Sequence, residues 1–186
     1  MPLASERYLT FYGPIRTPQT NNLRAALCAM VNEGAKKVTI LFASDGGSTE
    51  DGIALHIYLK SLPLEIIMHA AGWVSSIAIP VFLAADKRLA SQHAPFLFHE
   101  YSWAHSQATT TTQTTMNEHA LLLNGAMAWT QEIVKSRTTL TENEFNSLHL
   151  FDRPVLVSCT DAARYGIISG IAEPRIPAGS DPRIVV

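Results

Sequence analysis

Short apolar segments alternate with longer amphipathic segments along the first half of the chain, and this alternation is what most constrains the fold. Strands are expected at Arg7–Tyr12, at Val38–Phe42 as a buried strand, at Leu64–His69 and at Phe96–His99. Helices are expected at Asn21–Asn32, from an N-cap at Ser48 up to Pro63, and at Ser76–Ala84. Such alternation is typical of α/β layers. With no linker, repeat or low-complexity break, it predicts one α/β domain over residues 1–186.

The composition indicates a folded chain that binds neither nucleic acid nor membrane. At 186 residues and 47% hydrophobic content, the chain can bury a substantial core. Its net charge is −2, and it has no basic cluster that could neutralise phosphates. The first residues lack the features of a signal peptide, and no apolar run reaches membrane-spanning length. We therefore predict a cytoplasmic protein.

The residue types that bind metals show no suitable spacing. Cys28 and Cys159 form neither a disulfide framework nor a metal motif, so both are predicted to be reduced packing residues. Four histidines lack carboxylates or cysteines at metal-binding spacing: His93, His105, His119 and His149. No metal site is predicted.

The second half of the chain contains a long helix that needs partners. Residues Thr109–Thr115 are nearly all threonine and are expected to form a loop, either a plain flexible one or a mobile edge of a substrate groove. The helix predicted at Met116–Arg137 carries apolar residues around much of its circumference. Such a helix requires several apolar neighbours, which a second subunit would supply.

A serine and a histidine are candidates for covalent catalysis. Ser76 opens a small-residue helix, and His99 ends a short strand. A serine hydroxyl needs a base, a group that orients the base, and donors for the developing oxyanion. His99 is the candidate base and Asp152 the candidate orienting group. Backbone N–H groups at Gly46–Gly47 and just after Ser76 are the candidate donors.

Other polar residues are expected to have structural roles. Thr141 and Glu144 have the spacing of a capping box, and Ser158 and Asp161 are similar. His69 ends a strand and is expected to pack in the core. Glu100 should point away from His99, because neighbouring strand residues face opposite sides.

Several motifs, in order, resemble those of the proteolytic subunit of Clp protease (ClpP), a serine peptidase family of the crotonase-type superfamily. Ser44–Ser48 resembles the family's Ser-Pro-Gly-Gly turn, and Gly72–Ala78 resembles its Gly-Gln-Ala-Ala-Ser-Met-Gly. Phe96–Tyr101 resembles its Met-Ile-His-Gln-Pro, and Ser106–Thr109 its Gly-Gln-Ala-Thr. Residues Phe151–Gly166 resemble the end of the family's sequence, which has Asp-Arg-Phe-Leu-Ser and, further along, Tyr-Gly. The likeness extends roughly from Phe11 to Ile171.

The resemblance implies specific roles for site residues. Ser76 would be the nucleophile, because the family's serine stands four residues after the glycine matched by Gly72; Ser75 is the rival. His99 would be the base and Asp152 the orienting group. The oxyanion would be held by the backbone N–H groups of Gly47 and Ile77.

The resemblance also implies a fold, an activity and partners. The fold would be α/β, with ClpP/crotonase-like layered repeats of strands and helices and a protruding handle helix, the handle region covering about residues 107–150. The chain would be a serine endopeptidase subunit without a cofactor, acting on peptides or unfolded proteins. It would form a homo-oligomer of one ring or stacked rings, with an AAA+ unfoldase as an expected partner. Two alternatives stay open: a catalytically silent structural subunit, and an acyl-CoA hydratase or isomerase of the same superfamily.

The sequence departs from the family pattern near the predicted site. Asp45 replaces the proline before the paired glycines and brings a negative charge close to the oxyanion donors, where it would oppose the tetrahedral intermediate. Ala78 replaces a glycine at the start of the helix. Two extra residues, with Pro154 in the same stretch, separate Asp152 from Ser158 and could displace the aspartate.

Overall fold

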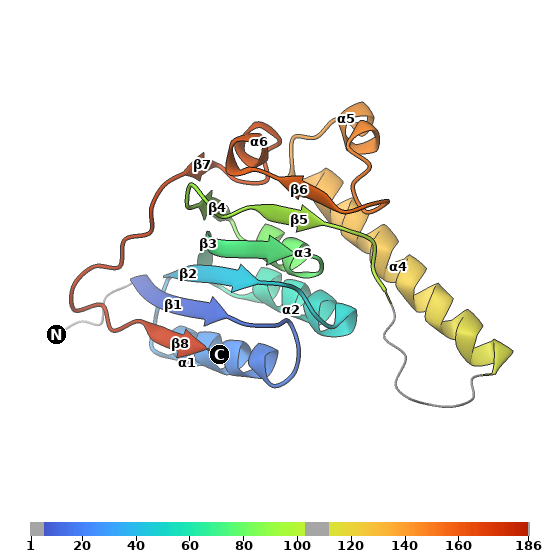
Figure 1. The fold of residues 1–186 in the computed structure, drawn as a ribbon. Helices are drawn as coiled ribbons and strands as arrows, with labels where there is room; N and C mark the ends of the chain where they lie inside the picture. Colours follow the sequence, from blue (N-terminus) through green and yellow to red (C-terminus); the bar gives the residue numbers. More distant parts are fainter. Residues whose placement is uncertain (1–5, 103–111, 186) are drawn as a thin grey trace.

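A mixed sheet of eight strands forms the centre of the molecule, and helices pack against it (Figure 1). The computed structural model describes residues 6–102 and 112–185. The strands are β1 (Glu6–Tyr12), β2 (Lys37–Ser44), β3 (Glu65–Ser75), β4 (Lys87–Ala90), β5 (Phe96–Phe98), β6 (Val155–Val157), β7 (Gly170–Ile171) and β8 (Arg183–Val185). The helices are α1 (Gln19–Asn32), α2 (Thr49–Ser61), α3 (Ala78–Leu83), α4 (Gln113–Arg137), α5 (Glu142–Ser147) and α6 (Cys159–Arg164). The predicted α/β class is confirmed.

Strand β3 organises the sheet because it pairs with three other strands. The main order is β6-β5-β3-β2-β1-β8, in which β6 is antiparallel to β5 and the other pairs are parallel. On the side of β3 opposite β2, its residues Ile67–Ala70 pair with β4, and Val74–Ser75 pair with β5. The prediction that this strand ends at His69 is therefore wrong. The Gly72 segment continues the strand because β2 and β5 supply partners that local sequence does not reveal.

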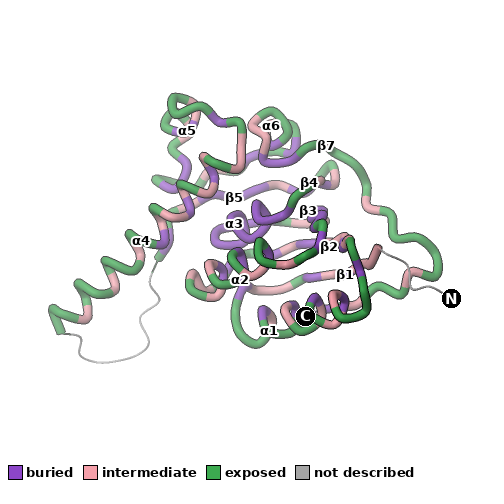
Figure 2. The backbone as a smooth tube through the Cα atoms, turned by 180° about the vertical axis from the view of Figure 1, so that it is seen from behind, coloured by how far each residue is buried: buried purple, intermediate pink, exposed green. Residues whose placement is uncertain are grey.

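Helices α1, α2 and α3 cover one face of the sheet, as the opposed views in Figures 1 and 2 both show. Strand β2 alternates strictly between buried and half-buried residues, so only one of its faces lies in the core. The prediction that Val38–Phe42 is a buried strand is therefore correct for one face only, because Thr39 and Leu41 are half-buried. In the core, the ring of Phe42 lies 5.4 Å from that of Phe11 and 6.3 Å from that of Phe82, and Phe82 continues to Phe96 at 5.3 Å.

Helix α4 extends away from the sheet and is anchored at its C-terminal half (Figures 1 and 2). Its buried residues are Ala126, Thr130 and Val134. The predicted loop at Thr109–Thr115 is wrong for Gln113–Thr115, which are helical because the Thr112 side chain accepts a hydrogen bond from the Thr115 N–H. Residues 109–111 of that prediction lie outside the described residues.

Two arginines join the end of α4 to the core. Arg137 donates from Nε to the Leu83 carbonyl (3.0 Å) and from Nη2 to the Ala85 carbonyl (2.8 Å). Arg88 donates from Nη2 to the Arg137 carbonyl at 2.9 Å. These bonds satisfy carbonyl groups that helix ends leave without intrahelical partners. The base of α4 is therefore fixed to the end of α3.

The predicted helix caps are confirmed. Thr141 and Glu144 form a complete capping box at α5, and hydrogen bonds from Thr141 lower the pKa of Glu144. Ser158 accepts from the Asp161 N–H at the start of α6.

His69 is buried, with Nε2 3.3 Å from Ser91 Oγ, and Cys159 is a buried free cysteine. Cys28 is exposed, so its predicted packing role is wrong.

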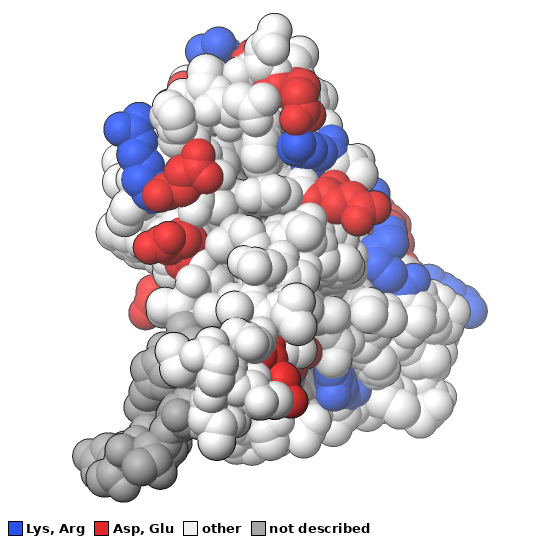
Figure 3. Space-filling view, turned by 90° about the vertical axis from the view of Figure 1, so that its right-hand side faces the viewer, with Lys and Arg blue, Asp and Glu red and all other residues white. Residues whose placement is uncertain are grey.

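Three features of the described residues bear on what the chain could bind. The face at the carboxyl ends of the parallel strands is largely uncharged, with separate groups of both signs (Figure 3). Across residues 6–102 and 112–185, no three His, Cys, Asp or Glu side chains gather as a metal site would require. None of the helices described has the length and apolar character needed to cross a membrane.

Candidate active site

Ser76 occupies a strained turn between a strand and a helix. Strand β3 ends at Ser75, and Ile77 caps α3. Ser76 has φ of +56°, a left-handed conformation that costs energy for a residue with a side chain. Its N–H donates to the Leu97 carbonyl (3.0 Å) and its carbonyl accepts from the Ile79 N–H (3.0 Å). Strand β5 and helix α3 thus hold the serine in this conformation.

The Gly46–Gly47 turn lies directly against Ser76. A Cβ built on Gly46 would stand 2.7 Å from Ser76 Cβ, and one on Gly47 would stand 2.3 Å from the Ile15 carbonyl oxygen. Both glycines have positive φ, +96° and +153°. The loop after β1 fixes the turn, because Ile15 N–H donates to the Gly46 carbonyl (2.8 Å) and its carbonyl accepts from Ser48 N–H (2.7 Å). Only glycine fits at these two positions.

The backbone N–H groups near Ser76 differ in whether they have a hydrogen-bond acceptor. Gly46 N–H donates to Ser44 Oγ at 3.2 Å. The N–H groups of Gly47 and Ile77 have no acceptor among the described residues. Backbone N–H groups without an acceptor are the kind of donor that an oxyanion requires.

His99 follows β5, two residues beyond Leu97. Its Nδ1 lies 2.6 Å from the Glu100 carbonyl oxygen. Because a carbonyl only accepts, Nδ1 carries a proton, and in the tautomer with one ring proton Nε2 is an acceptor. This is the tautomer that a general base uses. No hydrogen bond joins His99 to Ser76 in the described part of the chain.

Asp152 reaches the same edge of the sheet but has another partner. Strand β6 pairs Val155 with Phe98, which places the chain just before it near the end of β5. Asp152 Oδ2 lies 3.4 Å from Nδ1 of His149, and its side chain is 69% exposed. Asp152 therefore pairs with His149, whereas His99 is held by the carbonyl of Glu100. Sequence reasoning missed His149, although its spacing of three residues from Asp152 was visible.

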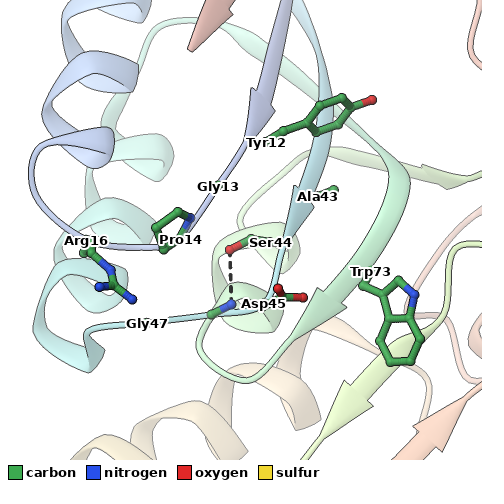
Figure 4. A pocket seen from close by; sticks show the side chains of 10 residues that line it. Tyr12, Gly13, Pro14, Arg16, Ala43, Ser44, Asp45, Gly47 and Trp73 are labelled. Atoms are coloured by element: carbon green, nitrogen blue, oxygen red, sulfur yellow. Dashed lines mark hydrogen bonds between the residues drawn. The ribbon is translucent and has the colours of Figure 1, made fainter. Parts of the chain in front are cut away.

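A cavity of about 580 Å³ adjoins the glycine turn (Figure 4). It is formed at the ends of β1 and β2 and by Trp73 of β3. Its lining residues are Tyr12, Gly13, Pro14, Arg16, Ala43, Ser44, Asp45, Gly46, Gly47 and Trp73. Sequence reasoning singled out Asp45 and the glycines but missed the two aromatic residues and Arg16, because nothing local connects three separate strand ends.

A family model and curated relatives match this chain. The family model described as Clp protease matches residues 1–175. The ATP-dependent Clp protease proteolytic subunit 3 of Rhizobium etli is 28% identical over 102 residues, 54% of this chain and 53% of that protein. Its counterpart from Rhizobium meliloti is 26% identical over 54% of this chain and 52% of its own length. The chain thus aligns with about half the length of these curated relatives.

The solved structures include a close match in fold. A ClpP1 mutant from Listeria monocytogenes has a TM-score of 0.78 and 22% identity, covering 91% of this chain and 92% of that one. The fold is therefore the ClpP type of α/β fold. The chain belongs to the Clp protease family.

Proposed function

We propose that this chain is a serine-type endopeptidase subunit that hydrolyses peptide bonds. The observation that carries the proposal is the strained turn at Ser76, packed against the Gly46–Gly47 turn. Ser76 is left-handed at the junction of a strand and a helix, which is the backbone arrangement that holds a nucleophilic serine in a sharp strand-to-helix turn. The family membership and the names of the relatives support the same reaction.

Each step of the proposed mechanism uses a group of this chain. Ser76 Oγ attacks the peptide carbonyl while His99 Nε2 accepts its proton. The N–H groups of Gly47 and Ile77 stabilise the oxyanion of the tetrahedral intermediate. His99 then protonates the departing amine, and water hydrolyses the acyl enzyme with His99 again as the base. The reaction requires no cofactor.

Asp152 is the proposed orienting group, in competition with a backbone carbonyl. To act, its carboxylate must leave His149 and reach Nδ1 of His99, where the Glu100 carbonyl already accepts. A triad aspartate that is lost reduces turnover by about 10⁴. If the carbonyl does most of the orientation, Asp152→Asn will reduce kcat by less than about tenfold. Steady-state kinetics of that variant decides between the two groups.

We further propose a homo-oligomer of one ring or stacked rings, in the cytoplasm. Helix α4, within the proposed handle region at about 107–150, leaves Leu121 72% and Leu122 55% exposed. A second subunit would cover these side chains. The proposed substrates are peptides and unfolded proteins, the latter delivered by an AAA+ unfoldase.

A catalytically silent structural subunit is the second candidate. The pairing of Asp152 with His149 favours it, and so does the Asp45 carboxylate in the cavity beside the oxyanion donors. Both features would weaken covalent catalysis without disturbing the fold.

Labelling with a fluorophosphonate separates the two candidates. We expect the wild-type protein and Ser75→Ala to be labelled and to cleave a fluorogenic peptide, and Ser76→Ala to do neither. Ser75 is the matched control, because it is adjacent and also buried. Labelling that survives Ser76→Ala and disappears in Ser75→Ala would overturn the assignment. Absence of labelling in folded wild-type protein would establish the silent subunit.

A further inference from the structure

The cavity beside the glycine turn shares Gly46 and Gly47 with the proposed active site, but Ser76 does not line it. A peptide bound for attack by Ser76 must pass the same turn. The side chain of a residue near the scissile bond therefore has a direct route into this cavity, whose volume of about 580 Å³ exceeds that of any one side chain.

The cavity has an acidic and aromatic end. Figure 4 shows the Asp45 carboxylate between the glycine turn and the indole of Trp73, with Tyr12 on the same side. Trp73 is 50% exposed and Tyr12 is 45% exposed, so both rings are available for contact. In the described part of the chain, no lysine, arginine or histidine forms an ion pair with Asp45.

Arg16 lies at the opposite side of the cavity, next to Pro14 (Figure 4). Its charge favours anionic groups there and repels cations. The two ends therefore differ in sign, and a positively charged group is directed to the end that contains Asp45.

A carboxylate with two aromatic rings matches the chemistry of a lysine or arginine side chain. The carboxylate pairs with the cation, the ring faces attract it, and the apolar stem packs against the aromatic surfaces. An apolar side chain would displace water from the exposed Asp45 carboxylate without replacing the hydrogen bonds of that water.

We propose that this cavity binds a lysine or arginine side chain close to the scissile bond of the substrate, and so directs the enzyme toward basic peptide sequences. The proposal rests on the proposed function and names its substrate class. It also explains how a carboxylate is tolerated near the oxyanion donors. A bound cation neutralises Asp45, so the basic side chain raises kcat as well as lowering KM.

Matched peptides test the proposal. Fluorogenic peptides carry lysine, arginine or norleucine at one position at a time around the cleavage site. At one position we expect kcat/KM for lysine and arginine to exceed that for norleucine roughly tenfold, with part of the gain in kcat. Asp45→Asn should reduce this ratio to near one, and added salt should reduce it in the wild type.

Glu65→Gln is the control variant. It changes the net charge by the same amount and lies exposed at the other end of β3. The preference for basic peptides should persist in this variant. Equal ratios in wild type and Asp45→Asn, or a ratio near one in the wild type at every position, would overturn the proposal while leaving the hydrolase intact.

A binding measurement separates this proposal from the proposed function. Isothermal titration calorimetry of the Ser76→Ala protein uses the same lysine and norleucine peptides, which that variant leaves uncleaved. Tighter binding of the lysine peptide, lost in Ser76→Ala combined with Asp45→Asn, supports the cavity even if the wild type shows no hydrolysis. Equal binding of the two peptides contradicts it.

Discussion

Helix α3 and the first half of helix α4 are both rich in apolar residues but have opposite surroundings. Every residue of α3 is buried beneath the sheet. On α4, large apolar side chains are exposed, among them Met116 at 52% and Leu121 at 72% (Figure 2). The apolar composition of a helix therefore does not tell whether its side chains are buried by other parts of the same chain. In α3 the buried apolar residues hold the turn at Ser76, whereas in α4 the exposed ones are the surface that the proposed second subunit would cover.

The comparison predicts the largest stability effect in the α3 region. Phe82→Ala removes a fully buried ring that contacts Phe42 and Phe96, and should reduce the free energy of unfolding by about 3–5 kcal/mol. Leu121→Ala should change it by less than about 0.5 kcal/mol in the dissociated protein. Urea denaturation at low concentration measures both. Similar losses would show that the two helices are not energetically distinct.

A glycine substitution tests whether the close contact between Gly46 and Ser76, next to the buried helix α3, is needed for the reaction of Ser76. Gly46→Ala places a methyl 2.7 Å from Ser76 Cβ, at a φ of +96°, and should reduce fluorophosphonate labelling by more than about 100-fold. Gly34→Ala is the matched control, because its φ is +83° and nothing lies within 4 Å. It should lose stability but retain labelling. Equal labelling of both variants would contradict the close approach of the turn.

The exposed side of α4 should control assembly. Leu121→Glu combined with Leu122→Glu replaces exposed apolar side chains with charge and should convert the proposed oligomer to smaller species, without a change in fold. Light scattering measures the mass, and circular dichroism checks the fold. Glu118→Gln, on the same helix, should leave the mass unchanged. A wild-type monomer at micromolar concentration would refute the proposed role of this surface.

The smallest expected effect is on the pH dependence of stability, at His56, which contacts both α3 and α4. His56 of α2 donates from Nδ1 to the Pro80 carbonyl of α3 (2.7 Å), and its ring lies 5.1 Å from that of Trp129 of α4. Burial lowers the pKa of His56 below its usual 6.5. The folded protein then binds fewer protons than the unfolded chain, so this contribution is complete above about pH 6.5 and is lost as the pH falls below it.

His56→Asn keeps a donor at this position and removes the titration. The free energy of unfolding, measured between pH 7 and 5, should therefore fall less steeply with acid in the variant. His69, whose pKa burial also lowers, retains part of the slope. An identical slope in the variant and the wild type would show that protonation of His56 does not couple the two helices.

Features encoded by neighbouring residues could be predicted from the sequence. The Asn21–Asn32 helix begins two residues earlier in the structure, at Gln19. Ser48 caps α2 as expected, by accepting from Asp51 N–H at 3.1 Å. Such features depend on side-chain periodicity and on hydrogen bonds a few residues apart, which contiguous sequence contains.

The geometry of the candidate site could not be predicted in the same way. The length of β3 depends on β5, and the partner of Asp152 depends on a turn in which His149 and Phe151 adopt positive φ. Phe151 is buried with its ring 5.4 Å from that of Phe98, so that the neighbouring Asp152 faces solvent. These outcomes depend on packing between segments that are distant in sequence, as β3 is from β5 and Phe98 is from Phe151.

The sequence by itself determined the α/β class, the helix caps and the residue types of the site. Only the tertiary structure decided that Ser76 is left-handed, that Gly46 packs against it, and that residues of three strands bring Asp45 into one cavity with Trp73 and Tyr12. The physical reason is that local propensity acts over a few residues. Strand pairing, by contrast, brings Ser76 N–H to the Leu97 carbonyl and Ile15 to the glycine turn.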